Sequence, residues 1–351
     1  MKDFLIVGAG IAGVSFAELC KQHNKSFVVY DDNSQPSSRI AGGLYNPVVL
    51  KRFSEVWKAK EQLQLAFPFY KRLEEKLQIT FDYKIPIYRR FASVEEQNDW
   101  FTAADKPSLS DFLSTKLIED KYPSVIASYG YGEVLYTGYL DVKKMVSSYS
   151  SYLKASQLLI SDRFNYDEVV ITKDSITYKD AKYKNIIFAE GFGLHANPYF
   201  NDLPLDGTKG ELLIIEAQNL QIDVTIKSNI FILPIGNNLY KVGATYDWND
   251  KSNVPTEIGK NELIEKLKDT ITCDYKIVEH FAGVRPTVKD RRPLVGTHYN
   301  YKNVHVLNGL GTRGVMLAPF LANQLFNHLV WGGNLEKEID IIRIYKKRNL
   351  I

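Results

Sequence analysis

The sequence predicts an α/β protein whose N-terminus forms a dinucleotide-binding unit. A short apolar strand from Phe4 to Val7 leads into the glycine turn GAGIAG at residues 8–13, and a helix from Val14 to Gln22 follows. A second apolar strand, Phe27 to Tyr30, ends at Asp31. This order of strand, glycine turn, helix and acidic strand end is typical of folds that bind a dinucleotide at the ends of parallel strands.

Each glycine of the turn has a separate task. Gly8 allows the tight turn, Gly10 lets the backbone approach a pyrophosphate, and Gly13 lets the helix and the strand pack closely. Ile11 and Ala12 follow Gly10, where free N–H groups at a helix start attract a diphosphate. The turn therefore predicts a cradle for the phosphates of a cofactor.

The acid that follows the second strand is the candidate ribose ligand. Asp31 stands 31 − 13 = 18 residues after Gly13, a spacing that lets an acid reach a ribose hydroxyl. Its neighbour Asp32 is a second candidate, although a solvated position suits it better. The motif does not separate NAD from FAD, and a fold of this kind with an empty cradle is the alternative interpretation.

Composition excludes several classes of protein. The chain has 351 residues, 45% hydrophobic and 24% charged, which is ordinary for a globular protein of about two domains. The formal net charge of +3 does not by itself argue for nucleic acid. Cys20 and Cys273 form neither a disulfide framework nor a metal-ligand spacing, so we expect a protein of the reducing cytoplasm without a metal site. No stretch approaches the ~18 apolar residues of a membrane span.

Three later glycine-containing segments could bring backbone to the same nucleotide. Gly42 and Gly43 offer a surface without side chains to a flat ring, with a plain surface loop as the alternative. The segment 185–193 predicts a buried strand that runs into Gly191. A strand near residue 304 leads through a glycine-rich loop into a helix that begins near Val315, a second helix N-terminus suited to negative charge. The cofactor contacts expected there are Gly311, Thr312, Arg313, Gly314 and Val315.

The remaining elements follow from periodicity and capping signals. The predicted helices are one over 56–77 that is interrupted or bent at Pro68, a short one with Ser93 and Glu96 as its capping box, one from Asp141 to about Leu153, and one over 256–271. The predicted strands lie at 211–217, 229–235 and 239–246, with the last two joined as a hairpin across 236–238.

Arg285 lies between a run of small apolar residues and Pro286, in "FAGVRPTV". A guanidinium cannot lose its charge, so an inward-pointing arginine requires an anion. Two interpretations stay open: a structural ion pair with an interior carboxylate, or an anionic substrate. Arg291 and Arg292, beside Asp290, are interpreted as a solvated charge cluster.

Taken together and in this order, "GAGIAG" with Asp31, "AGGLYNP", "FAEGFG", "FILPIGNNLYKVGAT", "AGVRPTVKDRRPLVG" and "GLGTRGVMLAP" resemble the FAD-dependent D-amino-acid oxidase superfamily. It includes glycine oxidase, monomeric sarcosine oxidase and the oxidase domain of the bifunctional tRNA wobble-uridine-modifying enzyme. The resemblance implies a Rossmann-type FAD-binding domain (1–80, 141–205 and 285–351) interleaved with a substrate domain on a mixed, mainly antiparallel sheet (81–140 and 206–284). It implies FAD as cofactor. We expect it to be noncovalent, because the "SSRIAGG" loop holds no Cys or His.

The resemblance also implies roles for three cations. Arg285 matches the arginine that binds the substrate carboxylate with two hydrogen bonds. Arg313 lies in a loop beside the flavin, where it binds the substrate anion or only stabilises the fold. Lys241 matches the lysine with which sarcosine oxidases assist oxygen reduction, with an exposed strand lysine as the alternative. Phe231 and Thr245 depart from the family, since amino-acid oxidases carry a tyrosine and sarcosine oxidase a histidine there. Tyr246 is a possible substitute for the missing tyrosine.

The function that follows is oxidation of the C–N bond of a small amine or amino acid, of the glycine, sarcosine or D-amino-acid type, by hydride transfer to flavin. O₂ or another acceptor then takes the electrons. Two alternatives stay open. One is oxidation of a carboxymethylaminomethyl group on a tRNA wobble uridine, although the sequence shows no dense run of basic residues for binding RNA. The other is a flavin-binding protein without turnover, which the changes at Phe231 and Thr245 would allow.

Overall fold

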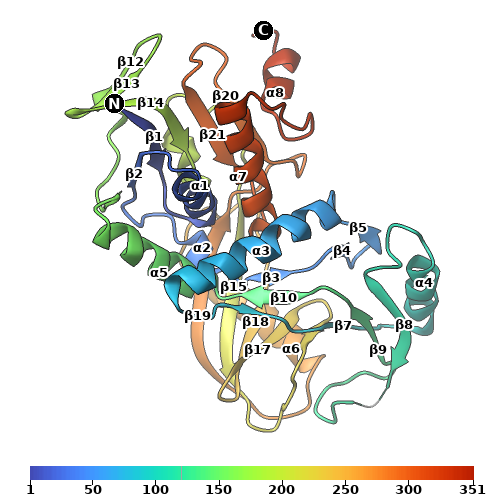
Figure 1. Cartoon of the computed structure of the whole chain (residues 1–351). Coiled ribbons are helices and arrows are strands. Elements are labelled where there is room, and N and C mark those ends of the chain that lie inside the picture. Colours follow the sequence, from blue (N-terminus) through green and yellow to red (C-terminus); the bar gives the residue numbers. More distant parts are fainter. Residues whose placement is uncertain (120) are drawn as a thin grey trace.

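The computed structural model describes residues 1–119 and 121–351, which form two large sheets with helices around and between them (Figure 1). The central strands of the first sheet are parallel, and both ends of the described chain lie close to this sheet. Its strands, in spatial order, are β11 (Leu159–Ile160), β2 (Phe27–Tyr30), β1 (Lys2–Val7), β14 (Ala181–Phe188), β13 (Ile176–Tyr178) and β12 (Val169–Ile171), with β21 (Val304–Asn308) parallel to β14 and β20 (Leu294–Thr297) antiparallel to β21.

The second sheet is mainly antiparallel, and β7 and β16 form its parallel pair. It lies below the first sheet in Figure 1. Its strands, in spatial order, are β19 (Lys276–Arg285), β15 (Thr208–Glu216), β18 (Leu239–Gly243), β17 (Phe231–Gly236), β16 (Thr225–Lys227), β7 (Ile87–Arg90), β9 (Tyr131–Val134) and β8 (Leu113–Ile118). Short strands between the sheets are β3 (Leu44–Tyr45), β10 (Gly138–Leu140), β6 (Asp82–Tyr83), β4 (Val48–Val49) and β5 (Ser54–Glu55).

The N-terminal unit forms as predicted, with one difference in the helix start. β1 and β2 run parallel with Val7 opposite Tyr30. Helix α1 (Ile11–Gln22) begins three residues before the predicted Val14, because Gly10 is its N-cap and the end of the glycine turn forms the first helical turn. Gly8 has a φ of +101°, a conformation that favours glycine.

Within the described residues, seven further α-helices and two short 3₁₀ turns surround the sheets. The α-helices are α2 (Ser37–Ile40), α3 (Ala59–Leu77), α4 (Val94–Ala104), α5 (Val142–Ala155), α6 (Glu257–Lys268), α7 (Gly314–Trp331) and α8 (Ile342–Lys347). The prediction of a helix from residue 56 is wrong by three residues, and α6 ends three residues before the predicted 271. Pro68 lies inside α3 without interrupting it.

Side-chain caps explain where three of these helices begin. The N–H of Glu96 donates to Ser93 Oγ at 3.2 Å, and the N–H of Lys144 donates to Asp141 Oδ1 at 3.0 Å. Thr256 caps α6 in the same way, at 3.0 Å from the N–H of Gly259. These caps satisfy N–H groups that lack a partner within the helix, and the predictions at Ser93 and Asp141 are confirmed.

The predicted hairpin is also confirmed. Strands β17 and β18 pair antiparallel on either side of Gly236, Asn237 and Asn238, and all three residues have a positive φ. Glycine and asparagine adopt that conformation more readily than other residues. Among the described residues, no helix combines the length and the apolar character needed to cross a membrane.

The principal core joins the helices that position the cavity. Helices α1 and α3 both pack against α7. The hydroxyl of buried Tyr70, on α3, donates to the carbonyl oxygen of Val315 at 2.6 Å. This bond ties α3 to the first turn of α7, so the start of that helix is held from the side of the core.

Candidate active site

One large cavity runs along the ends of the parallel strands and under the second sheet, with a volume of about 1790 Å³. That exceeds the range of about 300–1,000 Å³ typical of small-molecule sites, as an extended dinucleotide requires. It brings together segments that are hundreds of residues apart. The predicted cofactor residues that line it are Gly8, Gly10, Ile11, Ala12, Asp31, Asp32, Gly42, Gly43, Gly191, Gly311, Thr312, Arg313, Gly314 and Val315.

Two helix N-termini open onto this cavity. Neither α1 nor α7 has a side-chain cap bond from its N-cap residue, Gly10 or Arg313. Across the cradle, the N–H of Ile11 donates to Ser38 Oγ at 3.1 Å. The other free N–H groups and the positive ends of both helices make these positions suited to anions.

Asp31 and Asp32 occupy different environments although both line the cavity. Asp31 directly follows β2, with its carboxylate 4.0 Å from the guanidinium of Arg39, and burial raises its pKa. The exposed Asp32 accepts the N–H of Ser34 at 2.9 Å, which engages its carboxylate in a local turn. Of the two, the less exposed Asp31 is therefore the better placed to meet a ribose hydroxyl.

Gly13 does not line the cavity. A Cβ at this position would lie 1.9 Å from the carbonyl oxygen of Gly8, so a side chain would push α1 away from the turn. Gly13 therefore shapes the cradle through backbone packing, which is the task that its place in the motif predicts.

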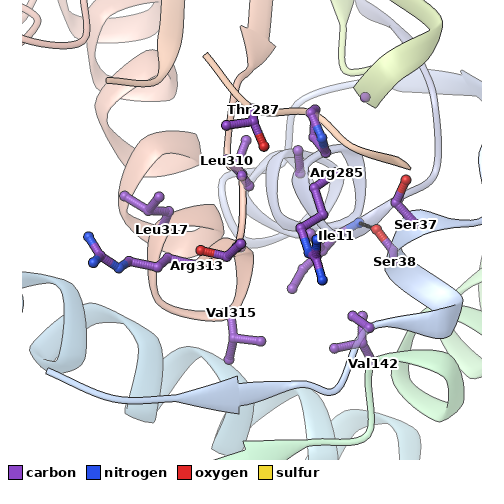
Figure 2. A pocket seen from close by; sticks show the side chains of 18 of the residues that line it. Ile11, Ser37, Ser38, Val142, Arg285, Thr287, Leu310, Arg313, Val315 and Leu317 are labelled. Atoms are coloured by element: carbon purple, nitrogen blue, oxygen red, sulfur yellow. Dashed lines mark hydrogen bonds between the residues drawn. The ribbon is translucent and has the colours of Figure 1, made fainter. Parts of the chain in front are cut away.

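The inner wall carries groups that lack protein partners. The buried hydroxyl of Thr287 lines the cavity and has no hydrogen-bond partner among the described residues (Figure 2). Gly42 lies against the ring of Phe231, which a Cβ would approach to 2.8 Å. The chain thus presents free N–H groups, an unpaired hydroxyl and a surface of glycine and aromatic groups, a set that fits a flavin dinucleotide.

Arg285 ends β19 and enters the cavity over Gly210, which has no side chain to obstruct it. Its hydrogen bonds go to carbonyl oxygens alone, Lys209 O at 3.2 Å and Thr245 O at 3.3 and 3.4 Å. Among residues 1–119 and 121–351, no carboxylate lies within ion-pairing distance of it. Burial lowers the pKa of Arg285. Of the two interpretations, the structural ion pair is therefore not found, and a half-buried cation stands free to meet an anion.

Tyr246 packs against this arginine. The Arg285 guanidinium lies over the Tyr246 ring at 4.6 Å, and both residues line the cavity. Phe231 lines it too, whereas the buried hydroxyl of Thr245 accepts the N–H of Glu211 at 2.8 Å and does not. A tyrosine thus stands beside the candidate carboxylate site, although it comes from a different position than in the resembling oxidases.

Arg291 and Arg292 also line the cavity, where Arg291 is exposed and Arg292 is partly buried, so the charge cluster interpreted as solvated lies at the site. Arg291 lies over the ring of Trp248 at 5.2 Å, and Arg292 over the ring of Trp57 at 5.6 Å. The tryptophans come from distant segments, which left no local signal in the sequence. The loop between β19 and β20 therefore turns its arginines toward the site.

Lys241 is not brought into this group. Lys241 does not line the cavity. Burial lowers the pKa of its amino group, and the charges that act on this group are those of Asp141 and Lys143. Its role toward oxygen stays a prediction.

Glu190 is a cavity-lining acid that the sequence analysis missed. It accepts hydrogen bonds from Asn197 Nδ2 at 2.7 Å and from the Tyr166 hydroxyl, yet burial raises its pKa to about 7. Its position directly before Gly191 is the one sequence feature that pointed to it.

A pH-dependent stability follows from Glu190. Between pH 4.5 and about 7, the unfolded chain ionises this carboxyl while the folded protein keeps it protonated, so raising the pH costs stability there. We expect the melting temperature of Glu190→Gln, minus that of the unmodified protein, to increase from pH 5 to 7.5 and then level off. Differential scanning calorimetry in matched buffers measures it, and a difference independent of pH would contradict the shift.

The two sheets enclose one long cavity, and the N-termini of α1 and α7 open onto it. This arrangement defines a dinucleotide-binding protein with room for a substrate. The chain belongs to the FAD dependent oxidoreductase family, whose model matches residues 3–327. It is therefore an FAD-dependent oxidoreductase of the D-amino-acid oxidase family, as the sequence motifs predicted.

Individual relatives are distant. Glycine oxidase of Bacillus subtilis is 22% identical over 348 residues, which cover 90% of each chain. The tRNA 5-methylaminomethyl-2-thiouridine biosynthesis bifunctional protein MnmC of Marinobacter nauticus is 22% identical over 98% of this chain and 59% of its own length. The crystal structures of glycine oxidase from Geobacillus kaustophilus and of iminodiacetate oxidase from Chelativorans sp. both superpose with a TM-score of 0.77 at 17% identity, covering 97% of this chain. At that identity the structures show the fold alone, and they confirm its class.

The attachment of FAD is a separate prediction. The cavity lining, as far as the structure describes the chain, includes no cysteine or histidine that could form a covalent bond to the flavin. We therefore expect acid precipitation of the purified protein to leave yellow FAD in the supernatant, measured by its absorbance. Flavin that stays with the washed pellet would contradict noncovalent binding.

Proposed function

We propose that this chain oxidises the C–N bond of a small amine that carries a carboxylate. The observation that supports it is Arg285, a cation inside the cavity that has no carboxylate partner in the described protein. A bidentate pair between this guanidinium and a substrate carboxylate would fix both the position and the orientation of the substrate. Bound FAD supplies the hydride acceptor, and O₂ or another oxidant then takes the electrons.

The chain's own residues divide the remaining work. Arg285 holds the carboxylate, and Tyr246 covers the guanidinium at 4.6 Å and limits its contact with water. Hydride transfer requires the neutral amine, and no histidine lines the cavity within the described residues to remove its proton. We therefore expect kcat/KM to rise with pH as the substrate amine loses its proton.

The experiment is a panel of amines on the FAD-loaded protein. Glycine, sarcosine, N-substituted glycines and D-amino acids are supplied with a peroxidase-coupled assay, and flavin bleaching is followed anaerobically to cover acceptors other than O₂. Bleaching by one of these substrates supports the proposal. A fully loaded flavin that no amine bleaches would overturn it and would favour a flavin-binding protein without turnover.

A second candidate is oxidation of a carboxymethylaminomethyl group on a tRNA wobble uridine. One observation favours it: Arg285 lies over the exposed ring of Tyr246, which lines the cavity, and Arg291 lies over the exposed ring of Trp248, an arrangement on which a base can stack. The similarity to the MnmC relative extends over 98% of this chain. Mass spectrometry of wobble nucleosides, after incubation of the protein with tRNA that carries the carboxymethylaminomethyl group, separates the two candidates.

A further inference from the structure

The cavity has a second group of cations besides Arg285. Three arginines line it together: Arg313 at the N-cap of α7, Arg291 in the β19–β20 loop and Arg52 in the β4–β5 turn. Burial lowers the pKa of Arg313, and the like charges of Arg291 and Arg52 lower it further. Like charges gathered in one cavity repel one another, and an anion bound between them would relieve that repulsion.

No protein group supplies that anion in the described chain. The side chain of Arg313 has no hydrogen bond and no ion pair among residues 1–119 and 121–351. Asp290, which also lines the cavity, pairs with Arg343 at 3.6 Å and accepts the N–H of Arg292 at 2.9 Å. Glu55 lines the cavity but makes no ion pair with these arginines. The positive charge around Arg313 is therefore uncompensated, as it is at Arg285.

The two unpaired arginines reach to different sides of the cavity. Figure 2 shows Arg285 extending toward Ile11 and Ser38, whereas Arg313 extends the opposite way, past Leu317. Tyr246 lies against the Arg285 guanidinium at 4.6 Å, and it lines the same cavity as both arginines. One molecule with anions at both ends could therefore meet both arginines, with its middle beside Tyr246.

We propose that the substrate carries a second anionic group, a carboxylate or a phosphate, and that Arg313 binds it with help from Arg291 and Arg52. This inference rests on the proposed function, because it takes Arg285 as the site of the first carboxylate. It narrows the substrate class from amino acids in general to amines with two acidic groups.

A small diacid fits better than a polyanion. Arg285 and Arg313 are half-buried, and Arg291 and Arg292 are stacked on tryptophans, so the charge is concentrated inside one cavity. Over the whole chain, 44 basic residues face 41 acidic ones, so the sequence shows no excess of charge for a long nucleic-acid track. Exposed Arg52 and Arg291 at the mouth would also steer a dianion inward.

The test measures binding rather than turnover. Oxidised, FAD-loaded protein is titrated with acetate, propionate and butyrate, with malonate, succinate and glutarate, and with phosphonoacetate and 3-phosphonopropionate. The flavin difference spectrum gives each Kd. We expect at least one diacid to bind about tenfold tighter, or more, than the monoacid of the same length, the gain of one additional charge-assisted hydrogen bond. Comparison of the dicarboxylates with the phosphonates then identifies the second anion.

Variants assign the effect to Arg313. In Arg313→Gln, and to a smaller degree in the more exposed Arg291→Gln, we expect the ratio of the monoacid Kd to the diacid Kd to fall toward one, compared at equal FAD loading. Arg72→Gln is the matched control, since Arg72 is exposed on α3, lies outside the cavity, and forms no hydrogen bond or ion pair in the described protein. It should keep the full preference.

The outcomes are distinguishable. Equal binding of monoacids and diacids, or a preference that survives in Arg313→Gln, overturns the second anion site and leaves the proposed function standing. If no acid of either kind perturbs the flavin, Arg285 is not a carboxylate site and both proposals fail. If diacids show no advantage but unmodified bulk tRNA perturbs the flavin and Arg313→Gln weakens that effect, the arginines serve a polynucleotide and the small diacid is wrong.

Discussion

Replacing Arg285 by methionine is expected to lower kcat/KM for the best carboxylate-bearing amine by two to three orders of magnitude. The loss is about 3–4 kcal/mol, the size expected when a buried, hydrogen-bonded charge pair loses one partner. It should appear mainly in KM, because the arginine holds the substrate. Steady-state kinetics on FAD-loaded protein measures it.

The same variant should keep its fold. Arg285 has no carboxylate partner among the described residues, so its removal leaves no buried anion behind, and its carbonyl bonds of 3.2 to 3.4 Å are long. We expect an unchanged or higher melting temperature and full FAD loading. Arg285→Lys, which keeps the charge without the planar fork, should recover part of the binding. A variant that unfolds, or that binds substrate normally, would contradict the role assigned to this residue.

Replacing Gly13 by valine is expected to abolish FAD binding. Already the Cβ would lie 1.9 Å from the carbonyl oxygen of Gly8, which is backbone and cannot rotate away. The helix must then move from the turn, which separates the N-terminus of α1 from the phosphates it binds. We expect at least a hundredfold rise in the Kd for FAD, equal to about 2.8 kcal/mol at 1.4 kcal/mol per tenfold, measured by flavin fluorescence quenching of the apoprotein.

Gly333→Ala is the matched control for that experiment. Its Cβ would lie 3.6 Å from the nearest atoms, which is ordinary contact, and the residue lies beyond the end of α7, away from the cavity. This variant should bind FAD normally. Retention of FAD by Gly13→Val would show that the turn tolerates a shift of the helix, and the cradle would then depend on other segments.

Local patterns were enough for the elements of the fold. The strand-turn-helix unit at residues 2–30 and the hairpin around Asn237 could be predicted because each depends on neighbours in the sequence. The caps at Ser93 and Asp141 were predictable for the same reason. Helix ends were less accurate: α1 and α3 begin three residues away from the predictions, since glycine turns and N-caps shift the first turn.

The candidate site needed the folded chain. Arg291 and Arg292 looked like a surface cluster until the fold placed Trp248 and Trp57 under them. Lys241 matched a family position, yet it does not line the cavity. Charge and residue type say little about the direction in which a side chain points, and that direction is set by segments far away along the chain.

By itself, the sequence determined the dinucleotide cradle, because glycine spacing and helix starts act over a few residues, and its motifs, taken in order, indicated a family that uses FAD. Only the tertiary structure decided that Arg285 stands without a carboxylate and that Arg313 faces like charges instead of an acid. Whether a buried charge is compensated depends on every element that packs around it. That is a property of the assembled cavity, and no stretch of the chain contains it.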